Sequence, residues 1–526
     1  MSGCEQTNPL IPALDVETFS EDCLYLNVYV PVNVQVSSGL QSNPAAVMVW
    51  IHGGGYFGGT ASSPSFEPYP LLAVNDFIFV SINYRLGAFG FLFTGDDSAP
   101  GNYGMLDQVE ALKWVHNNIE AFGGDPNRVT VGGESAGAAS THLLSMSPLS
   151  KDLFQQAYLQ SGSALCPWAV ELEEEKAIAA AYGIADILNC PTEEVSTAAV
   201  VACLRGVPAR NVTTATMSYL LTGITNMLPW TPVVDGYFLP DKPINIIRRK
   251  EFAPINVLLG SNKDEGNLFA LVAYPSYFIR DSPPPMSLSD FREQAPLFAY
   301  DYNSQMEMNA IEQEYIDWSR IHDRRADYLT TFSAFTTDQA FACPVDMTAR
   351  AYLSMGTNVY YYQMTHVPTT SLYNVIGIGP GWMGCTHAED LQFLFGWEFN
   401  PAISDKVDHT PEEIELSKQF MKYWTNFVVS GDPNLPAIST FIPWPSYTLP
   451  ELEYKIISVD MNNSRALKAD QCRFWNKYIA RVSTFTDDLD DLQHEWEAEI
   501  HQWRQEDLAE WKTTFEEYKD GIDGLK

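Results

Sequence analysis

Short apolar runs alternate along the chain with longer stretches in which apolar residues recur every three or four positions. The short runs are rich in β-branched and aromatic residues. Several are apolar throughout, as is typical of strands that are covered on both faces. Strands are therefore predicted at residues 24–30, 45–51, 77–83, 129–131, 157–160, 255–259 and 359–363.

The longer stretches have the periodicity of amphipathic helices, most clearly at residues 106–122 and 412–429. The second of these ends at Ser430-Gly-Asp-Pro433, which is a helix stop signal. Strands that alternate with helices predict an α/β protein with a mostly parallel sheet and helices on both of its faces. Residues 281–330 are polar and less regular, so we expect an irregular insertion on the sheet there rather than a separate domain.

The composition changes after about Val482. From Asp487 to Lys526 the chain has fourteen acidic and four basic residues, but apolar residues still recur there at helical spacing. We therefore predict an α/β domain over residues 1–482 and a separate amphipathic helix over residues 483–526.

Of the 526 residues, 46% are hydrophobic, which is enough to bury a large core. The 31 basic and 66 acidic residues give a net charge of −35. Because that field repels phosphate backbones, nucleic acid is excluded as a partner. No run approaches the ~20 apolar residues needed to span a bilayer, so no transmembrane segment is expected. Met1-Ser-Gly-Cys4 lacks the basic start and the apolar run of a signal peptide.

None of the eight cysteines lies in a C-x-x-C pair or close to a histidine cluster, so a metal site is disfavoured. N-glycosylation acceptor sequences begin at Asn211 and Asn462. Together with the even number of cysteines, they favour an oxidising, extracellular setting.

Gly133-Glu-Ser-Ala-Gly137 matches the pattern G-x-S-x-G between a predicted strand and a helix-compatible segment at residues 138–144. This context is typical of a nucleophile elbow, in which a strained turn exposes the serine, here Ser135. The glycines are needed because side chains two residues to either side of the serine would collide in so tight a turn. The other interpretation is a serine in an ordinary glycine-rich turn.

Donors for an oxyanion are available in His52-Gly-Gly-Gly55-Tyr56, which follows the predicted strand 45–51. The backbone N–H groups of Gly54 and Gly55 can approach an oxygen because no Cβ stands in the way, and the N–H of Ala136 adds a third donor. A phosphate-binding loop is the weaker reading, because neither G-K-[ST] nor G-x-G-x-x-G follows.

After such an elbow, the acid and the histidine come later in the chain, at the ends of later strands. Asp264 and Glu265 both follow the predicted strand 255–259, and spacing does not choose between them. His387 lies in a glycine-flanked loop after the predicted strand 359–363 and is the leading candidate for the base. The other downstream histidines before the tail are His322, His366 and His409.

Several motifs occur in the order and at the spacing of a known family. They are Glu21-Asp-Cys-Leu-Tyr-Leu-Asn-Val28, Gly53-Gly-Gly-Tyr56, Asn83-Tyr-Arg-Leu-Gly-Ala-Phe-Gly90, Gly133-Glu-Ser-Ala-Gly137, Gln160-Ser-Gly-Ser163, Asn262-Lys-Asp-Glu-Gly266 and His387-Ala-Glu-Asp-Leu-Gln-Phe-Leu-Phe-Gly396. Over about residues 4–480 the chain resembles the type-B carboxylesterase and cholinesterase family, which implies the α/β-hydrolase fold.

The resemblance implies that Ser135 is the nucleophile, that His387 is the general base and then acid, and that Glu265 orients the imidazole. It assigns the oxyanion hole to Gly54, Gly55 and Ala136. It also implies the disulfides Cys4–Cys23, Cys190–Cys203 and Cys343–Cys472, with Cys166 and Cys385 free. In addition, it implies an ion pair between Arg85 and Asp107 and a hydrogen bond from Ser161 to the triad acid.

The loop between Cys4 and Cys23 departs from the cholinesterase pattern, because it lacks the tryptophan on which a quaternary ammonium stacks. Glu134, beside the nucleophile, remains available to hold a cation. We expect the substrate pocket to be formed by Glu134, Trp168, Leu228, Trp230, Leu268 and Phe269. The alternative for the apolar members is a plain core role.

We expect a carboxylic ester hydrolase that works through an acyl-enzyme without a cofactor and takes small neutral or lipid-like esters. The alternatives are a cholinesterase and, in another class, a catalytically silent adhesion or scaffold member of the family. The family's N-terminal segment with its signal peptide is absent before Met1, so we expect a truncated start of a secreted protein. Trp496, Trp503 and Trp511 resemble the C-terminal peptide through which cholinesterases form oligomers around a proline-rich anchoring protein.

Overall fold

The computed structural model describes residues 2–6, 18–34, 44–222, 228–274, 282–283, 285–323, 325–377, 382–437 and 440–483. Within these residues, a nine-stranded sheet has the order β11-β10-β9-β8-β7-β6-β4-β5-β3. Neighbouring strands from β10 to β5 run parallel, and only the edge strands β11 and β3 pair antiparallel to their neighbours. The strands are β3 (Leu26–Tyr29), β4 (Ala45–Ile51), β5 (Ile78–Ile82), β6 (Gly124–Glu134), β7 (Gln156–Gln160), β8 (Asn256–Asn262), β9 (Val359–Met364), β10 (Glu453–Ile457) and β11 (Asn463–Arg465).

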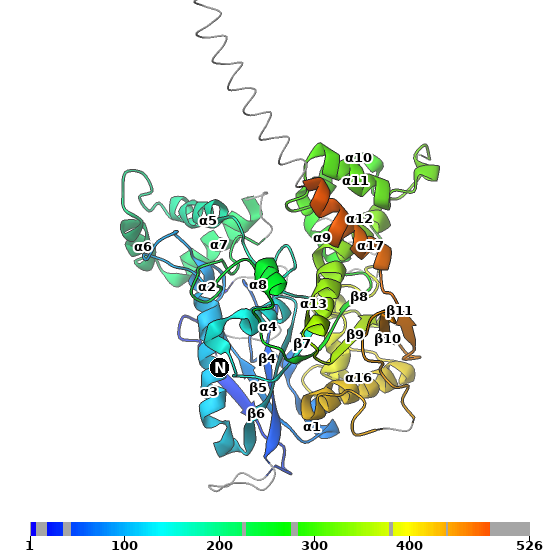
Figure 1. Cartoon of the computed structure of the whole chain (residues 1–526). Helices are drawn as coiled ribbons and strands as arrows, with labels where there is room; N and C mark the ends of the chain where they lie inside the picture. Colours follow the sequence, from blue (N-terminus) through cyan, green and yellow to red (C-terminus); the bar gives the residue numbers. More distant parts are fainter. Residues whose placement is uncertain are drawn as a thin grey trace, which may run out of the picture.

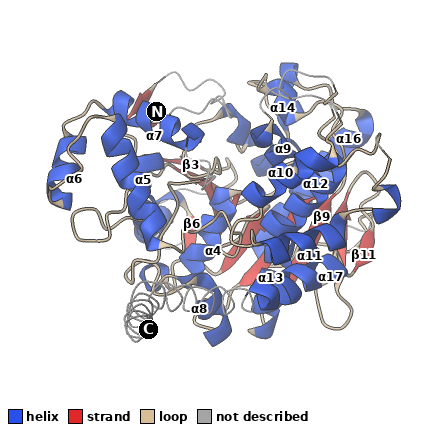
Figure 2. Ribbon diagram, turned by 90° about the horizontal axis from the view of Figure 1, so that it is seen from above, coloured by secondary structure: helices blue, strands red, loops and turns tan. Residues whose placement is uncertain are grey.

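Both faces of the sheet are buried, and helices cover each of them (Figures 1 and 2). The helices are α1 (Tyr69–Val74), α2 (Gly87–Phe91), α3 (Tyr103–Asn118), α4 (Ala136–Met146), α5 (Glu174–Ile187), α6 (Thr197–Arg205), α7 (Ala209–Thr222), α8 (Pro243–Arg249), α9 (Asn267–Ala273), α10 (Leu288–Phe298), α11 (Gln305–Tyr315), α12 (Leu329–Thr337), α13 (Cys343–Ser354), α14 (Leu372–Val375), α15 (Leu391–Leu394), α16 (Pro411–Ser430) and α17 (Ala469–Arg473).

The alternation of side chains along β4 explains the two layers. Val47 and Val49 join the core that includes residues of α3, α4 and α13, whereas Met48 and Trp50 join the core that includes residues of α1 and α16. Successive side chains of a strand point to opposite faces, so a strand that is apolar throughout requires cover on both. The predicted α/β fold is therefore confirmed.

Residues 281–330 differ from the sequence prediction, because the described part of this segment forms the helices α10 and α11. Each helix begins with a capping box, Ser287 with Asp290 and Ser304 with Glu307. These short polar starts satisfy the first free N–H groups of each helix, and the apolar residues that follow pack toward α12. The expected irregular insertion is thus wrong in its secondary structure.

The three predicted disulfides are present: Cys4–Cys23, Cys190–Cys203 and Cys343–Cys472. Cys166 and Cys385 are free and buried. Residues 484–526, which contain almost all of the predicted C-terminal helix, lie outside the described residues. Within the described part of the chain, no helix is both long and apolar enough to cross a membrane.

Arg85 and Asp107 form the expected ion pair with two side-chain hydrogen bonds. The guanidinium Nε and Nη2 donate to the carboxylate at 2.8 and 2.7 Å, and the backbone N–H of Arg85 donates to it at 3.0 Å. The side chain of Asp107 is only 7% exposed. This pair fixes the start of α2 against α3, below the loop that follows β4.

We predict that Asp107→Ala lowers the free energy of unfolding by about 2–3 kcal/mol, because it leaves a half-buried guanidinium and a backbone N–H without their acceptor. Glu110→Ala is the matched control, since it removes an exposed partner of Lys113 from the same helix and should change stability by less than about 0.5 kcal/mol. Urea unfolding with the disulfides intact measures both. Equal effects of the two substitutions would contradict this account of the pair.

Candidate active site

Ser135 lies in the sharp turn between β6 and α4, with φ 57° and ψ −124°. Its N–H donates to Gln160 O at 2.9 Å, which fixes the strained residue to the end of β7. A Cβ at Gly133 would lie 2.3 Å from Ile51 O, and one at Gly137 would lie 2.0 Å from the same oxygen. The two glycines are therefore required by the close approach of this turn to the end of β4.

This turn places the serine at the carboxyl edge of the sheet, directly before the first residue of α4. The free N–H groups at the start of a helix produce a positive potential there. The elbow therefore exposes a hydroxyl beside a site that favours negative charge.

Glu265 and His387 come together from the ends of β8 and β9. His387 Nδ1 and Glu265 Oε2 are 2.6 Å apart, and the Glu265 side chain is fully buried. The other carboxylate oxygen, Oε1, accepts the N–H of Asn262 at 2.7 Å. Asp264 points elsewhere, and its Oδ2 accepts the N–H of Cys385 at 3.0 Å. The structure thus separates two carboxylates that the sequence leaves equivalent.

The other candidate histidines lie away from this pair. His366 Nε2 is 2.9 Å from Glu413, and His409 contacts Glu398 and Gln392. His322 is exposed. The arrangement of His387 against a buried carboxylate is the one expected for a general base.

The Nε2 side of His387 faces Glu134, whose Oε1 lies 3.1 Å away. Among the hydrogen bonds of the described residues, none joins Ser135 Oγ to His387. Burial raises the pKa of Glu134 to about 8. Burial alone would lower the pKa of His387, but the negative charges of Glu134 and Glu265 outweigh it and raise that pKa to about 9. The Nε2 edge of His387 therefore faces a buried carboxyl group in this structure, and Glu134 Oε1 makes no hydrogen bond there.

The glycine loop after β4 bends around the serine. Gly54 and Gly55 have φ of 107° and 60°, and the carbonyl of Gly54 accepts the N–H groups of Phe57 and Gly58 at 3.1 and 3.0 Å. None of the hydrogen bonds described for this loop uses the N–H of Gly54 or Gly55 as a donor. A Cβ added at Gly53 would lie 3.0 Å from Ser135 Cβ, so the loop and the nucleophile are adjacent.

An aromatic wall packs against the histidine. The ring of Phe341 lies 4.8 Å from the ring of His387 and 5.6 Å from those of both Phe269 and Trp168. Trp168 Nε1 donates to Ala340 O at 2.9 Å. Sequence reasoning named Trp168 and Phe269 but missed Phe341, because it lies in a π-helical turn, Asp338–Ala342, that no local pattern indicates.

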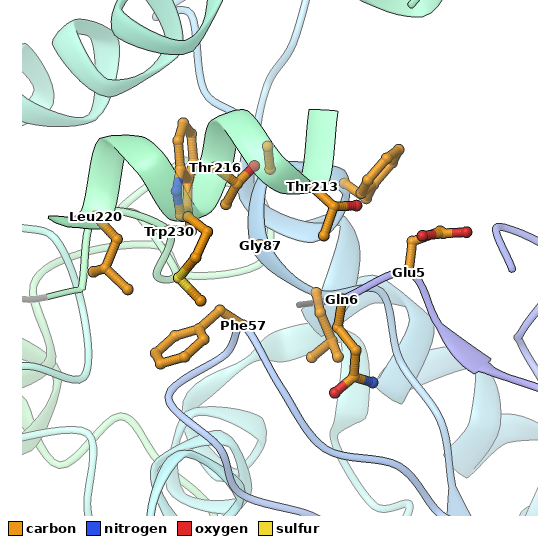
Figure 3. A pocket seen from close by; sticks show the side chains of 12 residues that line it. Glu5, Gln6, Phe57, Gly87, Thr213, Thr216, Leu220 and Trp230 are labelled. Atoms are coloured by element: carbon orange, nitrogen blue, oxygen red, sulfur yellow. The ribbon is translucent and has the colours of Figure 1, made fainter. Parts of the chain in front are cut away.

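The remaining predicted pocket residues lie at different places. Leu228 lies against Gly55, with its Cδ2 3.2 Å from where a Cβ of that glycine would be. Trp230 lines a separate small cavity with Phe57 and residues of α7 (Figure 3). Leu268 is half-buried on α9 and packs against the main core. Trp168 and Phe269 therefore contact Phe341, Leu228 lies against the oxyanion loop, and Leu268 donates its backbone N–H to Glu265 O at 3.2 Å.

Two further expectations concern polar side chains. The oxygen Oγ of Ser161 is buried without a hydrogen-bond partner, so the expected bond from Ser161 to Glu265 is not formed. Asn211 and Asn462, the predicted glycosylation sites, are both exposed. Within the described residues, no group of three or more His, Cys, Asp or Glu side chains is arranged to hold a metal ion.

Comparisons with known proteins agree with the sequence resemblance. A model described as the carboxylesterase family matches residues 1–475. The chain is 36% identical to an acetylcholinesterase of Bungarus fasciatus over 95% of this chain and 78% of that relative. It is 33% identical to acetylcholinesterase 1 of Caenorhabditis elegans over 95% of this chain and 81% of that relative. A family match over almost the whole chain and identities above 30% across 95% of it show that this protein belongs to the carboxylesterase family of serine ester hydrolases.

Proposed function

We propose that Ser135, His387 and Glu265 hydrolyse a carboxylic ester through a covalent acyl-enzyme. Ser135 Oγ attacks the ester carbonyl while His387 Nε2 takes its proton, and the protonated histidine then passes that proton to the leaving alcohol. Water, activated by the same nitrogen, attacks the acyl-enzyme and releases the acid and Ser135. Glu265 accepts a hydrogen bond from the Nδ1–H of His387 and stabilises the imidazolium.

The oxyanion formed at each addition step accepts the N–H groups of Gly54, Gly55 and Ala136. These groups come from the positive-φ loop and from the start of α4, and none of them needs a side chain to be oriented. Donors that are already oriented stabilise the developing charge without reorganisation.

One observation carries this assignment: the buried 2.6 Å contact between Glu265 and His387, at the same sheet edge as a strained Ser135. An ionisable pair without hydration is costly to maintain, and strain of this kind persists where function uses it. A silent adhesion or scaffold role requires neither, which is why we favour the enzyme.

We propose that the preferred substrates are small neutral or lipid-like esters. The wall beside His387 is apolar, and the loop between Cys4 and Cys23 contains no tryptophan. Glu134 is a weak cation site, because its carboxyl group already faces the Nε2 edge of His387 at 3.1 Å and burial raises its pKa, which disfavours the charged form. The relatives named as acetylcholinesterases favour the alternative, a choline ester.

We also propose an extracellular protein that assembles through its C-terminal helix. Three disulfides are typical of an oxidising compartment. The tryptophan-bearing acidic helix predicted over residues 483–526 has a long apolar stripe, which supports burial in an oligomer around a proline-rich partner.

One prediction of this proposal concerns the triad. Ser135→Ala and His387→Ala should each lower kcat by more than about 10³-fold, and Glu265→Gln by about 10²–10⁴-fold, because the three groups act as a unit. The matched control Asp264→Asn should change kcat by less than about threefold, since Asp264 does not contact the histidine. Ester hydrolysis with a chromogenic acetate and active-site labelling by an organophosphonate measure these effects. A large loss of kcat in Asp264→Asn, together with near wild-type kcat in Glu265→Gln, would refute the choice of Glu265 as the acid.

The second prediction compares acetylthiocholine with 3,3-dimethylbutyl thioacetate, which has the same shape without the charge. At physiological salt the two values of kcat/KM should agree within about fivefold, because the missing stacking tryptophan removes ~1–2 kcal/mol of cation affinity. Glu134→Gln should leave their ratio nearly unchanged. A preference of tens of times for the cationic ester would establish the cholinesterase alternative.

The third prediction concerns the tail. The full chain should be a dimer or tetramer, whereas a chain that ends at Val482 should be an active monomer, because the apolar stripe is then removed. Multi-angle light scattering measures both masses, with and without a polyproline peptide. The same mass for the two chains would eliminate the helix as an assembly element.

A further inference from the structure

The oxyanion loop, residues 53–59, has a backbone with several positive φ angles, which its glycines adopt readily but Tyr56 does not. Four of its residues have positive φ: Gly54 at 107°, Gly55 at 60°, Tyr56 at 64° and Gly59 at 110°. Tyr56 has a Cβ, so this conformation has an energetic cost there. Such backbone persists only where the surrounding structure determines it.

The buried side-chain amide of Gln6 forms hydrogen bonds with the end of this loop. Gln6 Oε1 accepts the N–H of Gly59 at 2.8 Å, and Gln6 Nε2 donates to the carbonyl of the same residue at 2.7 Å. The side chain therefore satisfies both polar groups of one residue, as a neighbouring β-strand would. Gln6 is only 3% exposed, so water does not compete for these bonds.

The segment that carries Gln6 is itself held in place. Gln6 Nε2 also donates to Cys4 O at 3.1 Å, and Cys4 is joined by its disulfide to Cys23. Asn83, which follows β5, donates to Cys23 O at 2.9 Å. The loop is thereby tied to the end of the central sheet.

The middle of the loop is held by Tyr56, whose buried ring packs against Phe91 and whose carbonyl accepts the N–H of Gly87 at 2.8 Å. Figure 3 shows Gln6 and Phe57 at the rim of a cavity that also borders Gly87, Thr216, Leu220 and Trp230. A hollow supplies no atoms to contact, so it does not fix a neighbouring backbone. Beyond Tyr56, the hydrogen bonds of Gln6 restrain the peptide groups of Gly59 directly.

We propose that Gln6 is a positioning residue that sets the oxyanion hole by fixing the peptide groups of Gly59. Holding Gly59 limits the rotation of the turn between Gly54 and Gly58, and so keeps the N–H groups of Gly54 and Gly55 aimed at the substrate oxygen. The inference rests on the proposed ester hydrolysis, in which those N–H groups act. Gln6 itself does not touch the reacting atoms.

The first test is Gln6→Met, which keeps the volume and removes all three hydrogen bonds of the side chain, two to Gly59 and one to Cys4 O. Turnover per titrated active site should fall by about 10–100-fold with KM changed less than about threefold, below the cost of deleting a donor outright. A trifluoromethyl ketone, which forms an oxyanion with Ser135, should bind more weakly by the same factor as kcat/KM. Unchanged kcat and unchanged ketone affinity would overturn the proposal.

The matched control is Asn434→Leu. Asn434 makes the same pair of hydrogen bonds, to the N–H and carbonyl of Trp444 at 2.7 and 3.1 Å, beyond the end of α16. The Asn434→Leu substitution should lower the unfolding temperature without weakening the binding of the trifluoromethyl ketone. If both variants lost ketone affinity equally, the effect at Gln6 would be one of general stability, and the proposal would fail.

The second variant, Gln6→Glu, remains informative if Gln6→Met does not fold. A protonated carboxyl both donates and accepts, so it restores both bonds, whereas a carboxylate sets a charge against the Gly59 carbonyl. The ratio of variant to wild-type kcat should therefore rise as the pH falls from 8 to about 5.5, since burial raises a carboxyl pKa into this range. A flat ratio would count against the proposal. A wild-type chain without esterase activity would instead refute the proposed function.

Discussion

The close approach of the turn after β6 to the end of β4 is the constraint on which the site depends. Ile51 O lies where a side chain at Gly133 or Gly137 would have to be, so the turn has its shape only with glycine at both positions. That contact places the strained Ser135 between the sheet edge and the start of α4. It also places the nucleophile beside the loop that leaves β4, so one steric contact sets the position of serine and oxyanion donors together.

A buried polar network determines the position of His387. Its carbonyl accepts the hydroxyl of Tyr373 at 3.1 Å, and Asp390, on the same turn, accepts Gln160 Nε2 at 2.7 Å. Since the carbonyl of Gln160 also accepts the N–H of Ser135, one residue connects the segments of the proposed base and the proposed nucleophile. Burial raises the pKa of Asp390 to about 6, and the hydrogen bonds from Gln160 and Asn262 oppose that rise.

The site combines polar side chains with apolar surroundings. Phe341 covers one face of the imidazole, and the carboxyl groups that face the ring are sealed from water. Low water content strengthens the interaction of the imidazolium with Glu265, but it also penalises an unpaired cation in the pocket. The apolar surroundings therefore support the proposed preference for esters of uncharged alcohols, because the loop between Cys4 and Cys23 has no tryptophan to replace the hydration of a charged group.

Most of the strands, the helices on both faces of the sheet, the serine elbow and the glycine loop could be predicted from the sequence, because each depends on residues close together in the chain. The strands β10 and β11 were not predicted, because they are short and partly polar. Apolar runs such as residues 45–51 have one physical solution, and so does glycine on both sides of Ser135. The helices of residues 281–330 were missed because their capping boxes are short signals within a polar segment. The choice of Glu265 over Asp264, the place of Phe341 and the grip of Gln6 on Gly59 depend on directions of side chains and on contacts between segments far apart in sequence. Only the packed structure decides these, because neighbouring carboxylates look alike until the fold points one of them at the histidine.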